Sequence, residues 1–351
     1  MKRIGNLIGL MAGLFLALVP AQLYAADAAL YTVPGIQVDA TAGSANAARD
    51  IALASGRPTA FQRLYRRITP PTAWDQQPQL DAAMLERLIL SMQIANERRS
   101  TTRYLAEVTY NFNPVEVQAL LRGNGIRFAE AQAKPVLVIP TMNNVYDPES
   151  EWARAWTQPS IAQGLVPVIL PFGDAADQPV LGRGGVAALG WEQLAPLAER
   201  YEVEEIVIAR ATPDGNAAQL IVLSEGRRQV ESVTYANSNF AATADGAAQL
   251  LAQDWKEAAA VDYSRRSRIV ADVVFNGPQD WSAIRQALSN VRTVADFDVL
   301  GLSLGAARVE LSYFGGPEQL GVAMAQQNLV FNGARGNYLL QLGNARAASR
   351  E

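Results

Sequence analysis

The chain has 351 residues, of which 49% are hydrophobic and 18% are charged, and its formal net charge is −4. It contains no Cys and no His. These two absences exclude Ser-His-Asp and Cys-His nucleophile systems, Cys/His zinc sites, His-ligated haem and C-x-x-C redox pairs. Because no coherent catalytic set remains, we expect a protein that is not an enzyme and that binds no metal or cofactor.

The amino terminus is typical of a secretory signal peptide. Lys2 and Arg3 are basic, the run from Leu7 to Val19 is largely apolar, and Ala25 ends a cleavage site of small residues. The apolar run is shorter than the roughly 20 residues that span a bilayer. We therefore expect cleavage after Ala25 and a periplasmic protein, with an uncleaved amino-terminal anchor as the alternative.

Charge and hydropathy also narrow the classes of partner. After the signal peptide, no segment is long and apolar enough to cross a membrane, and no run of Lys and Arg would follow a phosphate backbone. We therefore expect no nucleic-acid partner and no transmembrane segment. The compact basic cluster Tyr263–Arg268 has fewer cations than an electrostatic lipid site needs and leaves peripheral membrane association open.

Residues 26–132 are predicted to form an α+β domain. Tyr31–Ala40 alternates apolar and polar residues like a strand, and Ser44 then opens a helical stretch that Gly56 and Pro58 are expected to kink or split. The remaining elements expected here are a helix over Leu80–Ile94, a strand over Thr102–Phe112 and a helix over Pro114–Gly123.

Residues 133–262 are predicted to form a mainly parallel sheet covered by helices. Three short strands are apolar on both faces, as in a sheet buried on both sides: Val136–Pro140, Leu165–Pro171 and Ile206–Ala211. Two helices are expected between these strands, over Glu149–Gln163 and Trp191–Tyr201. An antiparallel pair and a long helix should follow, over Gln219–Ser224, Gln229–Tyr235 and Thr243–Ala260.

Residues 266–343 follow the strand and helix order βαββαβ, which is typical of a ferredoxin-like domain. The segments are Arg268–Phe275, Pro278–Leu288, Asp298–Leu304, Arg308–Phe314, Glu318–Gln326 and Tyr338–Leu342. Residues 344–351 are expected to form a tail. The sequence thus predicts a three-domain protein of α/β and α+β class.

Six segments together carry a resemblance to a known family: Ala52–Ile68, Tyr104–Phe112, Lys134–Pro140, Gly164–Asp174, Leu197–Arg210 and Val309–Phe331. In order and spacing they resemble the proteobacterial secreted family catalogued as domain of unknown function 2066, over nearly the whole mature chain. A Gly-rich insertion between Asp174 and Trp191 departs from the family pattern. The resemblance implies a location in the cell envelope.

The middle domain is also similar in pattern to a small α/β domain of envelope assembly proteins. That domain occurs in the TolB amino-terminal region, in the curli secretion channel and in flagellar T-ring proteins. The resemblance implies a module that presents a surface to other envelope proteins. Our leading hypothesis is therefore a periplasmic, non-catalytic interaction or assembly component with an envelope protein partner.

Three residues are candidates for a binding site. Trp152 and Trp156 lie four apart, so on a helix they share a face and can form an aromatic platform; core packing is the alternative. Asp174 follows a buried strand, where open α/β sheets place ligands; capping of the next turn is the alternative. If one pocket collects these residues, the chain is instead a small-molecule or glycan-binding protein, or a carboxylate-based hydrolase.

Overall fold

The computed structural model describes residues 29–162, 164–182, 185–234, 239–334 and 336–343. The expected signal peptide with its cleavage site and the expected tail over residues 344–351 lie outside these ranges. Within them, no helix has both the length and the apolar character that crossing a membrane requires.

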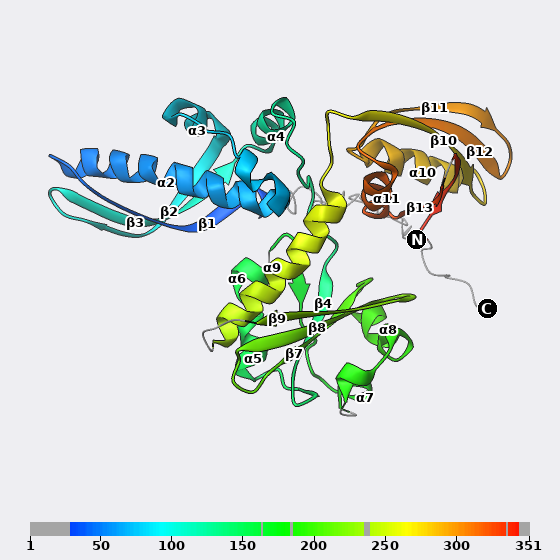
Figure 1. Cartoon of the computed structure of the whole chain (residues 1–351), viewed down its shortest axis with the longest axis horizontal. Coiled ribbons are helices and arrows are strands. Elements are labelled where there is room, and N and C mark those ends of the chain that lie inside the picture. The colour runs from blue at the N-terminus through cyan, green and yellow to red at the C-terminus, as the bar shows by residue number, and fades with distance from the viewer. Residues whose placement is uncertain (1–28, 163, 183–184, 235–238, 335, 344–351) are drawn as a thin grey trace, which may run out of the picture.

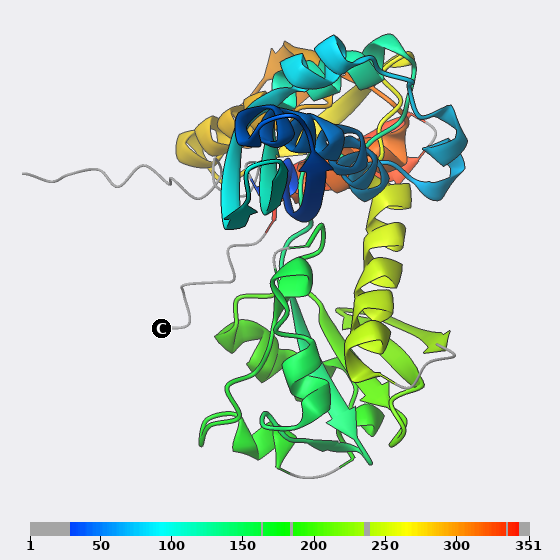
Figure 2. The ribbon, with the colours of Figure 1, turned by 90° about the vertical axis from the view of Figure 1, so that its left-hand side faces the viewer.

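The described residues form a mixed α/β structure with three separate sheets, as the sequence predicted (Figure 1). Along the chain, a three-stranded antiparallel sheet is followed by a six-stranded mixed sheet and then by a five-stranded mixed sheet. The long helix α9 (Phe240–Ala259) leads from the six-stranded sheet to the region where the other two sheets lie (Figure 2).

The three-stranded sheet has the spatial order β1-β3-β2. Its strands are β1 (Thr32–Thr41), β2 (Ile89–Arg99) and β3 (Arg103–Phe112), and α4 (Pro114–Gly123) follows them. The predicted helix over residues 80–94 is wrong beyond Leu88, because α3 (Ala82–Leu88) ends there and β2 begins. Residues 89–94 pair with β3 and form a strand despite the helical spacing of their apolar residues. Most β2 side chains are exposed, so the sequence lacks the alternation of apolar and polar residues that predicts a strand.

Helix α2 (Ala45–Ile68) lies against the three-stranded sheet. It begins after Ser44, whose side-chain oxygen accepts a hydrogen bond from a backbone N–H in the first turn. The expected split is wrong, because one helix continues through Gly56 and Pro58. The absence of a side chain at Gly56 instead allows close approach of the helix to Val38 and Tyr110 on the sheet.

The six-stranded sheet has the order β5-β4-β7-β8-β9, with β6 beside β4. Parallel pairing joins β4 to β6 and β7, and the remaining pairs are antiparallel. The strands are β4 (Val136–Met142), β5 (Val145–Tyr146), β6 (Val168–Ile169), β7 (Ile206–Ala211), β8 (Ala217–Ser224) and β9 (Arg227–Thr234).

Helices cover both faces of this sheet. Along β4, Val136 and Val138 belong to one buried cluster, and Leu137 and Ile139 belong to another, so the strand is buried on both sides as predicted. The first cluster includes residues of α5 (Glu151–Ala155), α6 (Pro159–Ala162) and α9, and the second includes residues of α7 (Gln178–Leu181) and α8 (Trp191–Arg200). Two short helices, α5 and α6, replace the single helix predicted over residues 149–163, since the residue before Pro159 disfavours helical geometry.

The five-stranded sheet has the order β11-β12-β10-β14-β13. The predicted βαββαβ order is present with one additional strand, because β13 and β14 form a hairpin where one final strand was expected. β14 lies parallel to β10. The elements are β10 (Arg266–Val274), α10 (Pro278–Asn290), β11 (Val294–Leu302), β12 (Ala306–Phe314), α11 (Pro317–Ala325), β13 (Leu329–Ala334) and β14 (Asn337–Leu342).

Candidate functional site

The two candidate tryptophans lie inside the core. Both indoles are 0% exposed, and their rings meet edge to face with centroids 5.5 Å apart. Trp152 Nε1 donates a hydrogen bond to the Ala209 carbonyl oxygen at 2.8 Å, which ties α5 to β7. The platform interpretation of Trp152 and Trp156 is therefore corrected: large apolar side chains at helical spacing here mark the face that packs on the sheet.

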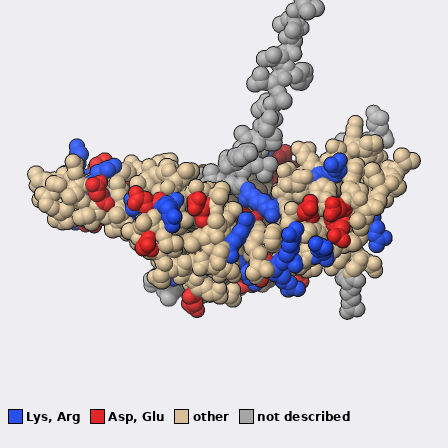
Figure 3. Space-filling view, turned by 90° about the horizontal axis from the view of Figure 1, so that it is seen from above, with Lys and Arg blue, Asp and Glu red and all other residues tan. Residues whose placement is uncertain are grey.

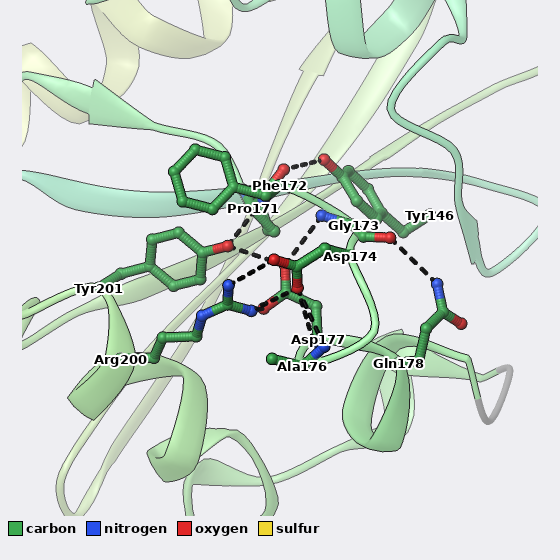
Figure 4. A network of polar contacts seen from close by, with 10 residues as sticks. All are labelled: Tyr146, Pro171, Phe172, Gly173, Asp174, Ala176, Asp177, Gln178, Arg200 and Tyr201. Atoms are coloured by element: carbon green, nitrogen blue, oxygen red, sulfur yellow. Dashed lines mark hydrogen bonds and ion pairs between the residues drawn. The ribbon is translucent and has the colours of Figure 1, made fainter.

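Asp174 lies in the segment between β6 and α7, five residues after the end of β6 (Figure 4). The strand predicted over Leu165–Pro171 is shorter than expected, because only Val168–Ile169 pairs with β4. The Asp174 carboxylate accepts hydrogen bonds from both terminal nitrogens of Arg200, at 2.6 and 2.7 Å, and from the Ala176 backbone N–H at 3.0 Å. The bond from Arg200 is the main reason why the pKa of Asp174 is lowered to about 2. Asp174 thus combines the capping of a turn with an ion pair to α8.

Asp177 forms the buried centre of this network. Its side chain is 0% exposed and pairs with Arg200. The same carboxylate accepts hydrogen bonds from the Gly173 backbone N–H and from the Tyr201 hydroxyl, both at 2.8 Å. The Tyr201 hydroxyl in turn accepts a bond from the Phe172 backbone N–H at 2.7 Å. Several donors therefore compensate the burial of this charge, and the segment is held against α8.

The network favours a structural role over proton transfer. Both carboxylates contact the same guanidinium. The bond from Arg200 lowers the pKa of Asp174 and burial raises the pKa of Tyr201, so neither of these two groups changes its protonation state near neutral pH. Within the described ranges, no group of three or more acidic side chains is arranged to hold a metal ion.

The structure does not bring the three candidate residues together. Trp152 and Trp156 belong to the buried cluster on one face of the six-stranded sheet. Asp174 is bound to Arg200 of α8, and α8 packs on the opposite face. A pocket collecting Asp174 with Trp152 or Trp156 was the geometry that the ligand-binding interpretation required. With the indoles buried, that interpretation of these residues is dropped.

We expect Asp174→Asn to lower the melting temperature at neutral pH and to leave it nearly unchanged near pH 2. The carboxyl has a pKa of about 2 in the fold against an ordinary value of 3.8. Its ion pair therefore contributes fully above about pH 4, and the contribution is lost as the pH falls through about 2. Thermal unfolding of wild type and variant from pH 2 to pH 7 measures this difference.

The matched control is Glu149→Gln, which removes a more exposed ion pair with Arg154. Exposed pairs contribute little, so this change should leave the melting temperature nearly constant. Equal stability of Asp174→Asn and wild type at pH 7 would contradict the role assigned to Asp174.

The end of β11 (Val294–Leu302) and the residues just after it carry exposed apolar side chains. We call these four residues the apolar β11 tip: Val299, Leu300, Leu302 and Leu304. Their exposed fractions are 44, 57, 61 and 98%, respectively. β11 is the outer strand of its sheet and, among the described residues, pairs with β12 alone. Its other edge therefore offers backbone N–H and C=O groups to a further strand.

Apolar side chains that gather on an exposed edge are typical of interaction sites. Sequence reasoning predicted the strand but missed the exposure of its side chains. A signal was present, because apolar residues continue as far as Leu304, directly before the Gly305 turn. At the end of a hairpin, an apolar run next to a turn lies away from the centre of the sheet, so it indicates exposed apolar surface.

Comparisons with known proteins leave the chain without an assigned family. No family model and no curated protein matches it. It is similar to a solved structure of competence or damage-inducible protein from Enterobacter asburiae, with 10% identity, 41% of this chain and 94% of that chain covered, and a TM-score of 0.22. It is also similar to a solved structure of competence damage-inducible protein A from Klebsiella pneumoniae, with 13% identity, 41% of this chain and 92% of that chain covered, and a TM-score of 0.23.

Histidyl-tRNA synthetase from Nostoc is also similar, with 13% identity, 38% of this chain and 26% of that chain covered, and a TM-score of 0.17. These scores are too low for any of the three likenesses to support an argument about function.

Proposed function

We propose that this chain is a periplasmic, non-catalytic interaction or assembly component of the cell envelope, and that it holds an envelope protein partner through the apolar β11 tip. The observation that carries the proposal is the run of exposed apolar side chains at the end of an edge strand. The signal-peptide pattern of residues 1–25 and the resemblance to the secreted family of domain of unknown function 2066 support the location, and we propose membership of that family as well.

The chemistry of the edge defines the kind of partner that fits. An extended segment can add to β11 as a further strand, with main-chain hydrogen bonds giving affinity and side chains giving specificity. Asp296 and Asp298 are exposed on the same strand. A partner segment with apolar residues next to Lys or Arg therefore complements both the tip and the strand before it.

The charged surface between the first and last sheets does not indicate a binding site. On the face seen in Figure 3, Lys and Arg side chains gather where the first and last sheets approach each other, and Asp and Glu side chains lie among them. Such mixed charge is typical of solvated surface and does not itself require a partner. The apolar β11 tip differs because its exposure to water is unfavourable until another apolar surface covers it.

We expect Leu302→Lys to remove the partner from the exported protein. Cells that export a tagged chain are cross-linked, the chain is purified, and quantitative mass spectrometry compares the proteins attached to variant and wild type. A buried apolar anchor at the centre of an interface contributes about 2 kcal/mol, so the captured partner should fall by at least about tenfold.

Val230→Lys is the matched control for this experiment. Val230 is 51% exposed on β9, which is also the outer strand of its sheet, so the change adds the same charge to a similar edge. The amount of partner protein captured with this variant should equal the amount captured with wild type. Equal capture by wild type and both variants would exclude the apolar β11 tip as the binding surface.

A further inference from the structure

An open strand edge also lies at the opposite end of the molecule from β11. β2 is an outer strand of the three-stranded sheet and, in the part of the chain that the structure describes, pairs only with β3. Its other edge therefore offers backbone N–H and C=O groups to a further strand. Figure 1 shows the sheets of β2 and β11 at opposite ends of the ribbon, so these two edges of one chain do not meet.

β2 begins with apolar residues and ends with basic ones. Leu90 and Met92 are 69 and 37% exposed. Arg98 and Arg99 are exposed at the end of the strand, and these two Arg and one Glu, Glu97, give β2 a net charge of +1. The strand thus has the features of the partner segment described above, which are apolar residues next to Lys or Arg.

β11 has the reverse order of side chains. Asp296 and Asp298 lie in its first half, and the apolar tip begins in its second half. In an antiparallel pair, the start of one strand lies opposite the end of the other. Antiparallel pairing of β2 with β11 therefore brings the two apolar halves together and places Arg side chains opposite Asp side chains.

One register of this pairing places Met92 opposite Leu302. In its own sheet, Met92 is the partner of Tyr110, and Leu302 is the partner of Ala307. Tyr110 and Ala307 are buried in the cores beneath the two sheets. Directly paired residues point to the same face of a sheet. Met92 and Leu302 therefore both point to the helix-covered face, where they can pack against each other.

The same register places Arg98 opposite Asp296. Arg98 is the partner of Leu105, and Asp296 is the partner of Ser312. On β3 and β12, the neighbours of Leu105 and of Ser312 along the strand are the core residues, so both Leu105 and Ser312 point to the open face. Arg98 and Asp296 therefore lie on one face and can form an ion pair.

The bulges of the two strands make these contacts compatible. Met92 and Arg98 are six positions apart, as are Asp296 and Leu302. Six positions along a regular strand return a side chain to the same face. Each strand, however, has one extra residue in between, after Ala95 in β2 and after Val299 in β11. In both strands the apolar and the charged side chain consequently point to opposite faces.

We propose that the partner of the apolar β11 tip is a second copy of this chain, whose β2 adds to β11 as an antiparallel strand. The inference rests on the proposed function, because it names the partner of the same surface. The two edges differ, so each contact leaves one β2 edge and one β11 edge free. Head-to-tail addition therefore continues from copy to copy unless the rotation between copies closes a ring.

Introduced cysteines test the contact directly, because the chain contains no Cys. One tagged copy has Met92→Cys, a second copy with another tag has Leu302→Cys, and both are exported by the same cells. Opposite residues of an antiparallel pair have Cα atoms about 4.5–5.5 Å apart, a separation that a disulfide can bridge. We expect a disulfide-linked dimer with both tags on a non-reducing gel.

Val230→Cys in place of Met92→Cys is the matched control. Val230 is 51% exposed on β9, which is also an outer strand. This copy should form no dimer with the Leu302→Cys copy. An equal yield of dimer from the Val230→Cys and Met92→Cys copies would overturn the pairing of β2 with β11.

Exchange of charges tests the register in the exported and purified chain. Arg98→Asp or Asp296→Arg alone places like charges opposite each other, so the dissociation constant of self-association should rise about tenfold in sedimentation equilibrium. A chain with both changes restores an opposite-charge pair in every contact, so its dissociation constant should return to that of wild type. Arg227→Asp on β9 is the matched control and should leave self-association unchanged. A double variant as weak as the single variants would overturn the register.

Failure of this inference differs from failure of the proposed function. If a protein other than this chain is cross-linked at position 302 and the two tagged copies form no dimer, the second copy is overturned as partner, and the apolar β11 tip remains a binding surface. If position 302 contacts neither another protein nor a second copy, both proposals are overturned.

Discussion

Trp152→Ala is expected to lower the free energy of unfolding by about 3–5 kcal/mol, the usual cost of truncating a fully buried tryptophan. The indole is 0% exposed and contacts Trp156 and Phe240. Its truncation leaves a cavity between α5, α9 and the six-stranded sheet. It also removes the donor to the Ala209 carbonyl oxygen. The loss of contacts and the unpaired carbonyl act in the same direction.

Urea unfolding of wild type and variant, followed by circular dichroism, measures the difference. Phe172→Ala is the control, since this ring is 74% exposed and its removal should change stability by less than about 1 kcal/mol. If Trp152→Ala were as stable as wild type, the indole would not be a core side chain, and the exposed-platform interpretation would regain its basis.

Gly56→Ala is expected to destabilise the protein, although alanine is the better helix former. Helix propensity alone favours alanine over glycine by about 1 kcal/mol. A Cβ at this position, however, would lie only 2.8 Å from Val38 Cγ1 and would meet the Tyr110 hydroxyl. That hydroxyl is buried and donates to the Leu53 carbonyl oxygen at 2.7 Å. The helix must therefore move off the sheet or break this bond, at a cost of about 1–3 kcal/mol for overpacking.

Gly321→Ala in α11 is the matched control for helix propensity. Its Cβ would lie 3.8 Å from Phe331 Cδ1, an ordinary contact, so this change should stabilise the protein by up to about 1 kcal/mol. Thermal unfolding of the two variants should thus show shifts of opposite sign. A stabilised Gly56→Ala variant would contradict the close packing of α2 on the three-stranded sheet.

Local patterns predicted those elements whose side chains are buried in a regular way. The continuous apolar runs at β4 and β7 indicated burial on both faces, and both strands lie in the centre of the six-stranded sheet. Ser44 marked the start of α2 correctly. Strand β2 was mistaken for a helix because it is an outer strand with mostly exposed side chains, and its pairing with β3 is a nonlocal contact.

The candidate site was harder to predict than the fold. The spacing of Trp152 and Trp156 shows that they share a helix face, but it does not show whether that face meets the sheet or water. Asp174 lies in the segment after a strand, as predicted, although β6 ends earlier than expected. Its bond to Arg200 joins residues 26 positions apart, which no local pattern encodes.

Site-specific photo-cross-linking in cells tests the proposed binding surface, with the reactive side chain placed at position 302 or, for comparison, at position 230. We expect light to join one dominant envelope protein to the chain from position 302 and not from position 230. Cross-links of equal yield to the same proteins from both positions, or none from position 302, would contradict an interaction through the apolar β11 tip.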